Sequence, residues 1–312
     1  MKIGAVIVTY NRKELLLQNI KACLAQSKQL SVIIIVDNHG TDGTYDYIKS
    51  NLKDSEFSLI DYRYLEKNIG GSGGFHVGTK FAYELGCDLI WLMDDDGRPK
   101  NAKTLEELIT FILQNGYENS PFIVNSLVCC DDLNLSFGLI ENGIIKYRIE
   151  ELEKDVIEGF INPFNGTMIS KYLIDKIGYP RGDYFIKGDE VEYFRRCKSN
   201  NVPIFTISTS LYYHPSPNSN LKKKRFFKKE ILNNIEAGWK EFYSMRNSCL
   251  NSKQYDRHSF IKNVRRYMIR VIKILLMGKH KFKLIHMVTK GFFHGIFGKS
   301  GIYYLPGDKK VK

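Results

Sequence analysis

The sequence predicts an α/β fold with a mostly parallel central sheet, followed by a basic helical region at the C-terminal end. Over residues 1–126, short apolar runs alternate with segments of helical spacing. This pattern is typical of a parallel sheet covered by helices on both faces. The 312 residues are 43% hydrophobic and 26% charged, which supplies a large core and excludes intrinsic disorder. Basic residues gather beyond residue 220, where the apolar spacing becomes helical.

The first half contains five short runs of apolar, often β-branched residues, which we expect to be strands. They are Ile3–Thr9, Leu30–Val36, Phe57–Tyr64, Asp88–Met93 and Phe122–Val128. Between them, apolar residues three and four positions apart predict helices over residues 12–26, 41–51, about 75–86 and 105–114. A glycine-rich turn is expected at Asn68–Gly74, a hairpin within residues 127–160, and mixed strand and helix over residues 161–214.

The net charge of +12 is unevenly distributed. Residues 220–312 hold 23 Lys or Arg and 5 Asp or Glu, a net charge of +18, and the first 219 residues carry a net charge of −6. Residues 216–229, with the run Lys222–Arg225, predict a basic loop, and residues 230–312 predict basic amphipathic helices with apolar stripes over 261–275 and 282–296. Such helices either lie on an anionic membrane surface or pack their stripes against the rest of the protein. Nucleic acid is disfavoured as a partner, because no recognised nucleic-acid motif accompanies the charge.

The sequence also predicts a location. No apolar stretch reaches the roughly 18 residues of a membrane-spanning helix, and the first residues favour a core strand over a signal peptide. The six cysteines show no C-x-x-C spacing, which favours reduced thiols over zinc or disulfide sites. We therefore expect a cytoplasmic protein, bound peripherally at the inner face of the cell membrane. The oligomeric state stays open.

Three consecutive carboxylates, Asp94, Asp95 and Asp96, follow the apolar strand that ends at Met93. Their mutual repulsion is costly unless a cation offsets it, and in an extended turn Asp94 and Asp96 can point to the same side. Carboxylate oxygens suit hard divalent ions, so these two residues are predicted to bind Mn²⁺ or Mg²⁺. His214, after another strand-like segment, is the candidate third ligand. The alternative is a solvated acidic turn that caps the following helix.

The glycine-rich segment Asn68–Phe75 lies between a predicted strand and a predicted helix. Gly71 and Gly73 are expected to let the backbone approach a phosphate at the helix N-terminus. A tight strand-to-helix turn would explain the same glycines. Asp37, which follows the second strand, can bond a nucleotide's base or ribose, or close an Asx turn.

Acidic residues open a helix predicted to begin near Asp189. Asp189 and Glu190 are favourable partners of the helix dipole, and one of them is the candidate general base.

These motifs, in this order, resemble glycosyltransferase family 2, whose members have the GT-A fold. NIGGSGGF followed by WLMDDDG resembles more narrowly its galactofuranosyl- and rhamnosyltransferase-like branch. The other matching segments are VIVTYNR (Val6–Arg12), VDNHGTDGT (Val36–Thr44), NPFNGTMIS (Asn162–Ser170) and GDEVEYFRR (Gly188–Arg196). The resemblance covers about residues 1–250.

The resemblance implies roles for individual residues. Donor contacts are expected from Thr9, Tyr10, Arg12, Asp37, Asn68, Gly71, Gly73, Asp94, Asp95 and Gly166. The family's order at the acceptor-side motif is Glu then Asp, whereas here Asp189 precedes Glu190. By position Glu190 inherits the role of base, and Asp189 remains an alternative.

The resemblance also implies an activity: metal-dependent, inverting transfer of a sugar from a nucleotide-sugar to a hydroxyl of a glycan or lipid-linked glycan in bacterial cell-surface polysaccharide synthesis. UDP-galactofuranose is the favoured donor, and rhamnosyl and other hexosyl donors stay open. We expect a catalytic domain over residues 1–215, with a nucleotide-sugar half of about 1–126 and an acceptor half of about 127–215. The alternatives are a nucleotidyltransferase, disfavoured because Thr9–Arg12 lacks glycine, and a non-catalytic adaptor that binds membrane or nucleic acid.

Overall fold

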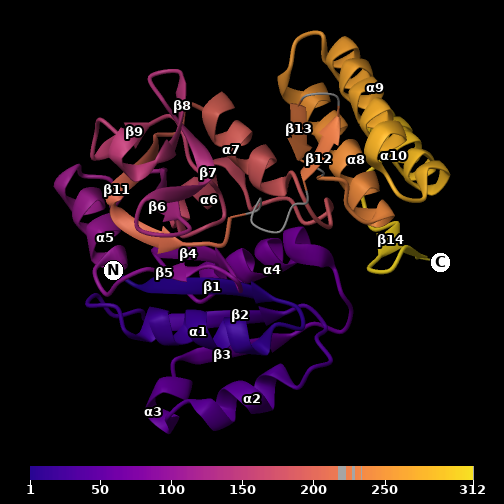
Figure 1. The fold of residues 1–312 in the computed structure, drawn as a ribbon. Coiled ribbons are helices and arrows are strands. Elements are labelled where there is room, and N and C mark those ends of the chain that lie inside the picture. The colour runs from indigo at the N-terminus through magenta and orange to yellow at the C-terminus, as the bar shows by residue number, and fades with distance from the viewer. Residues whose placement is uncertain (217–222, 227–228, 233, 312) are drawn as a thin grey trace. The chain divides into compact units, whose positions relative to one another are not determined.

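The computed structural model describes residues 1–216, 223–226, 229–232 and 234–311, and it divides into two compact units (Figure 1). Unit 1 comprises Met1–Pro180 and Tyr193–Pro217. Unit 2 comprises Arg181–Glu192 and Asn218–Lys312. The segment Arg181–Glu192, which the sequence places within the acceptor half, thus belongs to the C-terminal unit.

Unit 1 is built on a mixed, mostly parallel sheet with the strand order β3-β2-β1-β4-β10-β6-β11-β5. The bounds in this order are Ile60–Tyr64, Val32–Asp37, Ile3–Thr9, Leu89–Asp94, Thr167–Ser170, Ile123–Cys129, Ile204–Tyr213 and Arg98–Pro99. The first four strands are parallel, β10 runs antiparallel to both of its neighbours, and β6 and β11 are parallel to each other. The structure confirms the expected sheet.

The central strands are apolar on both faces because both faces are covered. Ala5, Ile7, Ile33 and Ile35 enter one core cluster, whereas the alternate residues Val6, Val8, Ile34 and Val36 enter the other. Full burial of a Val or Ile side chain contributes about 1.5–3 kcal/mol. The helices of this part are α1 (Lys13–Leu24), α2 (Thr44–Asn51), α3 (Asp54–Phe57), α4 (Gly70–Glu84), α5 (Thr104–Gln114) and α6 (Lys171–Ile177).

The glycine-rich segment departs from its prediction, because most of it lies inside α4 rather than in a turn before it. A Cβ atom at Gly74 would lie 2.4 Å from Val8 Cγ1, and one at Gly78 would lie 2.4 Å from Val6 Cγ1. These two glycines therefore let α4 pack closely on β1. A Cβ at Gly71 would meet nothing within 4 Å.

The expected hairpin within residues 127–160 is formed by β7 (Asn134–Glu141) and β8 (Ile144–Arg148), which pair antiparallel. A single 3₁₀ turn (Ile149–Glu151) and β9 (Val156–Glu158), which pairs with β11, follow.

The basic loop predicted over residues 216–229 is wrong in part. β12 (Lys223–Phe226) and β13 (Lys229–Leu232) form an antiparallel pair, and residues 217–222 and 227–228 lie outside the described residues. Phe and Ile favour strands and occur in or beside both segments. The many basic residues around them hide this strand signal in the sequence.

Unit 2 contains α8 (Gly238–Tyr255), α9 (Ser259–Met277) and α10 (Lys281–Ile296), which lie side by side (Figure 1). A short pair of strands, β14 (Tyr304–Leu305) and β15 (Lys309–Lys310), follows. α7 (Asp189–Ser199) begins in unit 2 and its residues from Tyr193 onward belong to unit 1. No helix within the described ranges is long and apolar enough to cross a membrane.

Candidate functional site

The carboxyl ends of the parallel strands in unit 1 meet at one edge of the sheet. Thr9 of β1 is in register with Asp37 of β2, Asp37 with Tyr64 of β3, and Val8 of β1 with Asp94 of β4. Ligands of open α/β sheets bind at this edge. The register therefore brings the predicted residues of three separate motifs together.

Asp95 is the anchor of the acidic turn. It is buried, and its carboxylate accepts hydrogen bonds from Thr9 Oγ1 (2.9 Å), the Tyr10 backbone N–H (3.4 Å) and Arg12 Nη1 (3.0 Å). Burial raises the pKa of Asp95, and the Arg12 guanidinium partly offsets this effect. Asp95 thus ties the turn after β4 to the turn after β1.

Asp96 lies between two cationic groups. Arg12 Nη1 donates to its Oδ2 (2.8 Å), and His214 Nε2 lies 3.4 Å from its Oδ1. Burial alone would raise the pKa of Asp96, but His214 and Arg12 outweigh it and lower that pKa. Burial likewise opposes protonation of His214, and Asp96 overcomes it and raises the His214 pKa. Ionised Asp96 and protonated His214 therefore stabilise each other.

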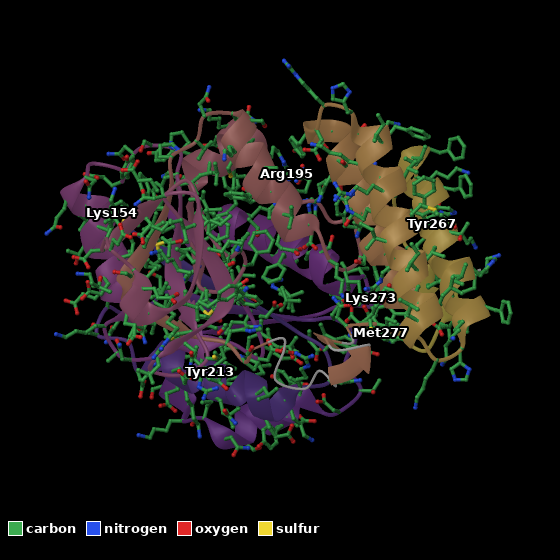
Figure 2. All side chains as sticks on the ribbon, turned by 45° about the horizontal axis from the view of Figure 1, so that its top comes forward. Lys154, Arg195, Tyr213, Tyr267, Lys273 and Met277 are labelled. Atoms are coloured by element: carbon green, nitrogen blue, oxygen red, sulfur yellow. The ribbon has the colours of Figure 1, made fainter. Side chains whose placement is uncertain are left out.

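The position of His214 is set by β11, whose last residue is Tyr213 (Figure 2). His214 Nδ1 lies 2.7 Å from the Pro215 carbonyl oxygen. An N–H at Nδ1 donates to that oxygen, so Nε2 is the nitrogen that faces Asp96. A hydrogen bond from the far ring nitrogen to a carbonyl is also the usual arrangement of a metal-binding histidine.

Asp94 is the acid of the turn whose carboxyl group has no hydrogen-bonded cationic partner among the described residues. Its backbone carbonyl accepts from Asn19 Nδ2 (3.0 Å), but within the described part of the chain no residue donates a hydrogen bond to its carboxylate. Burial, then the neighbouring Asp96 and Asp95, raise the pKa of Asp94 to about 8. A divalent cation would favour the ionised form of this carboxyl.

The residues at this edge fit a hard divalent cation in their chemistry, although they do not form a ready-made cage. Among the described residues, no three His, Cys, Asp or Glu side chains are arranged as a metal site. Arg12 already takes up one oxygen of Asp96. Asp94 and Asp96 would supply two carboxylates, which suit Mn²⁺ and Mg²⁺ with phosphate oxygens as further ligands. His214 would add an imidazole nitrogen.

The ends of β2 and β3 are held by side chains that contact backbone amides. Asp37 Oδ1 accepts from the Gly40 backbone N–H (2.7 Å), and its Oδ2 accepts from the Tyr62 hydroxyl. Asp37 thus holds the turn after β2 through a bond to a backbone amide three residues further along. Asn38 Oδ1 accepts from the Ile69 backbone N–H (2.8 Å), and Asn68 Oδ1 accepts from that of Gly70 (2.9 Å).

Tyr212 is a residue of this region that the sequence analysis missed. It is fully buried beneath the acidic turn, and its hydroxyl has no hydrogen-bond partner among the described residues. A Cβ at Gly97 or Gly166 would lie 2.6 Å from the Tyr212 ring. Gly166 is predicted from the family motif to contact the donor. The close approach of the Tyr212 ring is a second, structural reason for glycine at this position. The only sequence signal for Tyr212 is its place two residues before His214.

Asp189 and Glu190 lie in unit 2, at the start of α7, the helix that also carries Arg195 (Figure 2). Asp189 is buried and Glu190 is partly exposed. The loop before them is sharply bent, with positive φ at Phe185, Lys187 and Gly188. The Gly188 backbone N–H donates to Glu190 Oε2 (2.8 Å).

Buried polar side chains of α8 hold this loop. Asn247 Nδ2 lies within hydrogen-bond distance of the carbonyl oxygens of Ile186 (2.8 Å) and Lys187 (2.7 Å). Asn251 Nδ2 donates to the Gly188 carbonyl (2.8 Å). The backbone that presents the candidate bases is therefore fixed by a helix about sixty residues further along the chain, which no local sequence signal predicted.

A model of glycosyl transferase family 2 matches residues 5–177, more than half of the chain. The chain belongs to glycosyl transferase family 2. Over 222 residues this glycosyltransferase is 32% identical to the galactofuranosyltransferase GlfT1 of Mycolicibacterium smegmatis, covering 68% of this chain and 70% of GlfT1. It is 23% identical to the dTDP-rhamnosyl transferase RfbF of Shigella flexneri, covering 70% of this chain and 71% of RfbF.

Solved structures share the fold of this glycosyltransferase. S. aureus TarS 1–349 in complex with UDP-GlcNAc has a TM-score of 0.60 at 15% identity, covering 95% of this chain and 82% of that one. The mannosyltransferase PcManGT of Pyrobaculum calidifontis, in complex with GDP-Man and Mn²⁺, has a TM-score of 0.55 at 10% identity, covering 93% and 73%. The expected GT-A fold is confirmed.

Proposed function

We propose that this glycosyltransferase moves galactofuranose from UDP-galactofuranose to a hydroxyl of a glycan or lipid-linked glycan, with inversion at the anomeric carbon. The single observation that carries the donor half of this proposal is the row of strand ends, in which Thr9, Asp37 and Asp94 share one edge of the sheet. The identity to GlfT1 favours galactofuranose. The likeness to RfbF makes dTDP-rhamnose the second candidate donor.

Residues from three strand ends bind the donor in this proposal. Asp37 and Tyr10 contact the nucleoside, and the first turn of α4, with Gly71 and Gly73, faces the diphosphate, where backbone N–H groups and the helix dipole favour negative charge. Mn²⁺ or Mg²⁺ held by Asp94, Asp96 and His214 would offset the charge on the leaving diphosphate. Arg12, anchored on Asp95 and Asp96, adds a fixed positive charge at the same edge.

The acceptor is activated by a carboxylate at the start of α7. Glu190 takes the proton of the acceptor hydroxyl while the hydroxyl oxygen forms a bond to the anomeric carbon. The bond from that carbon to the diphosphate breaks at the same time, and its electrons leave with UDP. The configuration inverts in this single displacement. Asp189 is the alternative base, because the order of the two acids is reversed relative to the family motif.

We place this reaction at the inner face of a bacterial cell membrane, in the synthesis of a cell-surface polysaccharide. The acceptor then carries a lipid, and the basic C-terminal region meets the anionic headgroups around it.

The test measures nucleotide release from UDP-galactofuranose, dTDP-rhamnose, UDP-galactose and UDP-N-acetylglucosamine, with Mn²⁺ and then with excess chelator. We expect the fastest release from UDP-galactofuranose and its loss in chelator. Faster release of dTDP from dTDP-rhamnose would assign rhamnose, instead of galactofuranose, as the transferred sugar. Full activity in chelator would overturn the metal assignment, and no release from any sugar nucleotide in the presence of lipid-linked glycan acceptors would overturn the proposed function.

A further inference from the structure

Helix α9 presents apolar side chains to solvent along one side. The residues concerned follow helical spacing and are Ile261, Met268, Ile269, Ile272, Leu275 and Leu276, which we call the outer face of α9. Ile261 is 67% exposed and Ile272 is 51% exposed. The opposite side, with Asn263, Ile274 and Met277, is buried. Figure 2 marks the course of α9 by Tyr267, Lys273 and Met277.

The two C-terminal apolar stripes therefore differ. Most of the stripe expected over residues 282–296 is covered, since Val288 and Phe292 lie in the core that α10 shares with α8 and α9. Phe282, in the first turn of α10, is instead 93% exposed. Packing within unit 2 covers most of the α10 stripe. Among the described residues, the outer face of α9 and Phe282 stay exposed. A contiguous exposed apolar surface of this kind marks an interaction site.

The cations of α9 and of the segment that links it to α10 separate into two groups. Those turned toward the rest of unit 2 have polar partners: Arg270 Nε donates to Glu241 Oε2 (2.7 Å), and Lys273 Nζ donates to Asn234 Oδ1 (2.6 Å). Arg265, on the outer face, and Lys279 and Lys281, beside Phe282, have no ion pair or hydrogen bond to any described residue. No Asp or Glu occurs between Asp256 and Asp308.

We propose that the outer face of α9, together with Phe282, Arg265, Lys279 and Lys281, docks on an anionic lipid bilayer. Apolar side chains ringed by unpaired cations match the boundary between acyl chains and negatively charged headgroups. A second copy of this surface is a poorer partner, because a stretch without a single acid offers no counter-charge to itself. The inference rests on the proposed function in one respect, that a lipid-linked acceptor gives the docked enzyme its substrate.

The test is sedimentation of the full chain with vesicles of phosphatidylcholine alone and of phosphatidylcholine with phosphatidylglycerol. We expect binding to the anionic vesicles only, decreasing as salt rises, because salt screens exposed charges. Lys279→Gln with Lys281→Gln should weaken binding by roughly 25-fold, since each cation near an anionic surface contributes about fivefold in affinity. Ile269→Ser with Ile272→Ser should weaken it by at least tenfold.

Leu113→Ser is the matched control, because Leu113 is an exposed residue of α5 in unit 1. It should bind anionic vesicles as the unchanged protein does, and all variants should keep its circular dichroism spectrum. Equal binding of the Ile269→Ser, Ile272→Ser variant and the unchanged protein would overturn the proposal. The proposal would also be overturned if the unchanged protein did not bind vesicles but self-associated, and if the Ile269→Ser, Ile272→Ser variant lost that self-association. Sedimentation uses no sugar nucleotide, so it stays informative if the proposed transfer fails.

Discussion

Three adjacent aspartates at the end of β4 have three different environments. Asp95 is held by Thr9 and Arg12, Asp96 is paired with Arg12 and His214, and Asp94 has no cation of its own. The sequence predicted the cluster and its place at a strand end. It could not predict which acid lacks a cationic partner, because the compensating groups come from the ends of β1 and β11 and only the sheet brings them near.

Asp94→Asn and Asp95→Asn should change the stability of the metal-free protein in opposite directions. The pKa of Asp94 is raised to about 8, so between the unfolded value near 4 and pH 8 the folded state binds the extra proton and stability falls as pH rises. Asp94→Asn removes this loss and should raise the melting temperature at pH 9. Asp95→Asn weakens the bonds from Thr9 and Arg12 and should lower it.

Thermal melts of both variants in chelator check this pair. The same melts with Mn²⁺ and UDP test the metal assignment, because the unchanged protein should gain stability and Asp94→Asn should gain much less. A drop in melting temperature for Asp94→Asn at pH 9 in chelator would contradict the raised pKa of Asp94.

Glu190→Gln should lower kcat by roughly 10²-fold or more, the usual effect of losing a general base. Donor binding should stay nearly unchanged, because the proposed donor contacts come from the sheet. Steady-state kinetics alongside UDP titration separates the two effects. A crippled Asp189→Asn beside an active Glu190→Gln would assign the base to Asp189.

At the scale of elements, the glycines of α4 serve two different purposes. Gly74 and Gly78 face β1 at a distance that excludes a Cβ, and Gly71 faces open space. The sequence analysis placed Gly71 and Gly74 in a turn before the helix, and glycine disfavours helix interiors. Tertiary packing overrides that preference here, since close approach of α4 to the sheet needs the missing side chains. The strands, by contrast, were predictable, because burial on both faces leaves an uninterrupted apolar run.

Gly74→Ala should destabilise the fold by about 1–3 kcal/mol, the usual cost of overpacking a core. Gly71→Ala is the matched control for stability, and it should be neutral or stabilise by up to about 1 kcal/mol, because alanine favours a helix. Urea unfolding measures both. If Gly71 faces the diphosphate, Gly71→Ala should still raise KM for the donor, and an unchanged KM would remove Gly71 from the donor site.

At the scale of the whole molecule, the sequence predicted the sheet, the C-terminal helices and the charge asymmetry, all of which follow from local periodicity and composition. It did not predict that Arg181–Glu192 belongs with the C-terminal helices. That association depends on Asn247 and Asn251 contacting backbone carbonyls of the loop. A polar side chain in a helix gives no signal of which distant carbonyl it will bond.

The hydrogen bonds from α8 to the loop before α7 limit where this enzyme can be truncated or joined to a relative in a chimera. A protein truncated after Pro215 would keep the sheet, the acidic turn and His214. The loop before Asp189 and Glu190 would lose the side-chain amides that fix its backbone. Water would then bond the carbonyls of this loop, and no side chain would hold the positive φ angles of the loop, so the loop would relax. A chimera that borrows the C-terminal helices of a relative must therefore borrow residues 181–192 with them, as a cassette of two separate stretches of sequence.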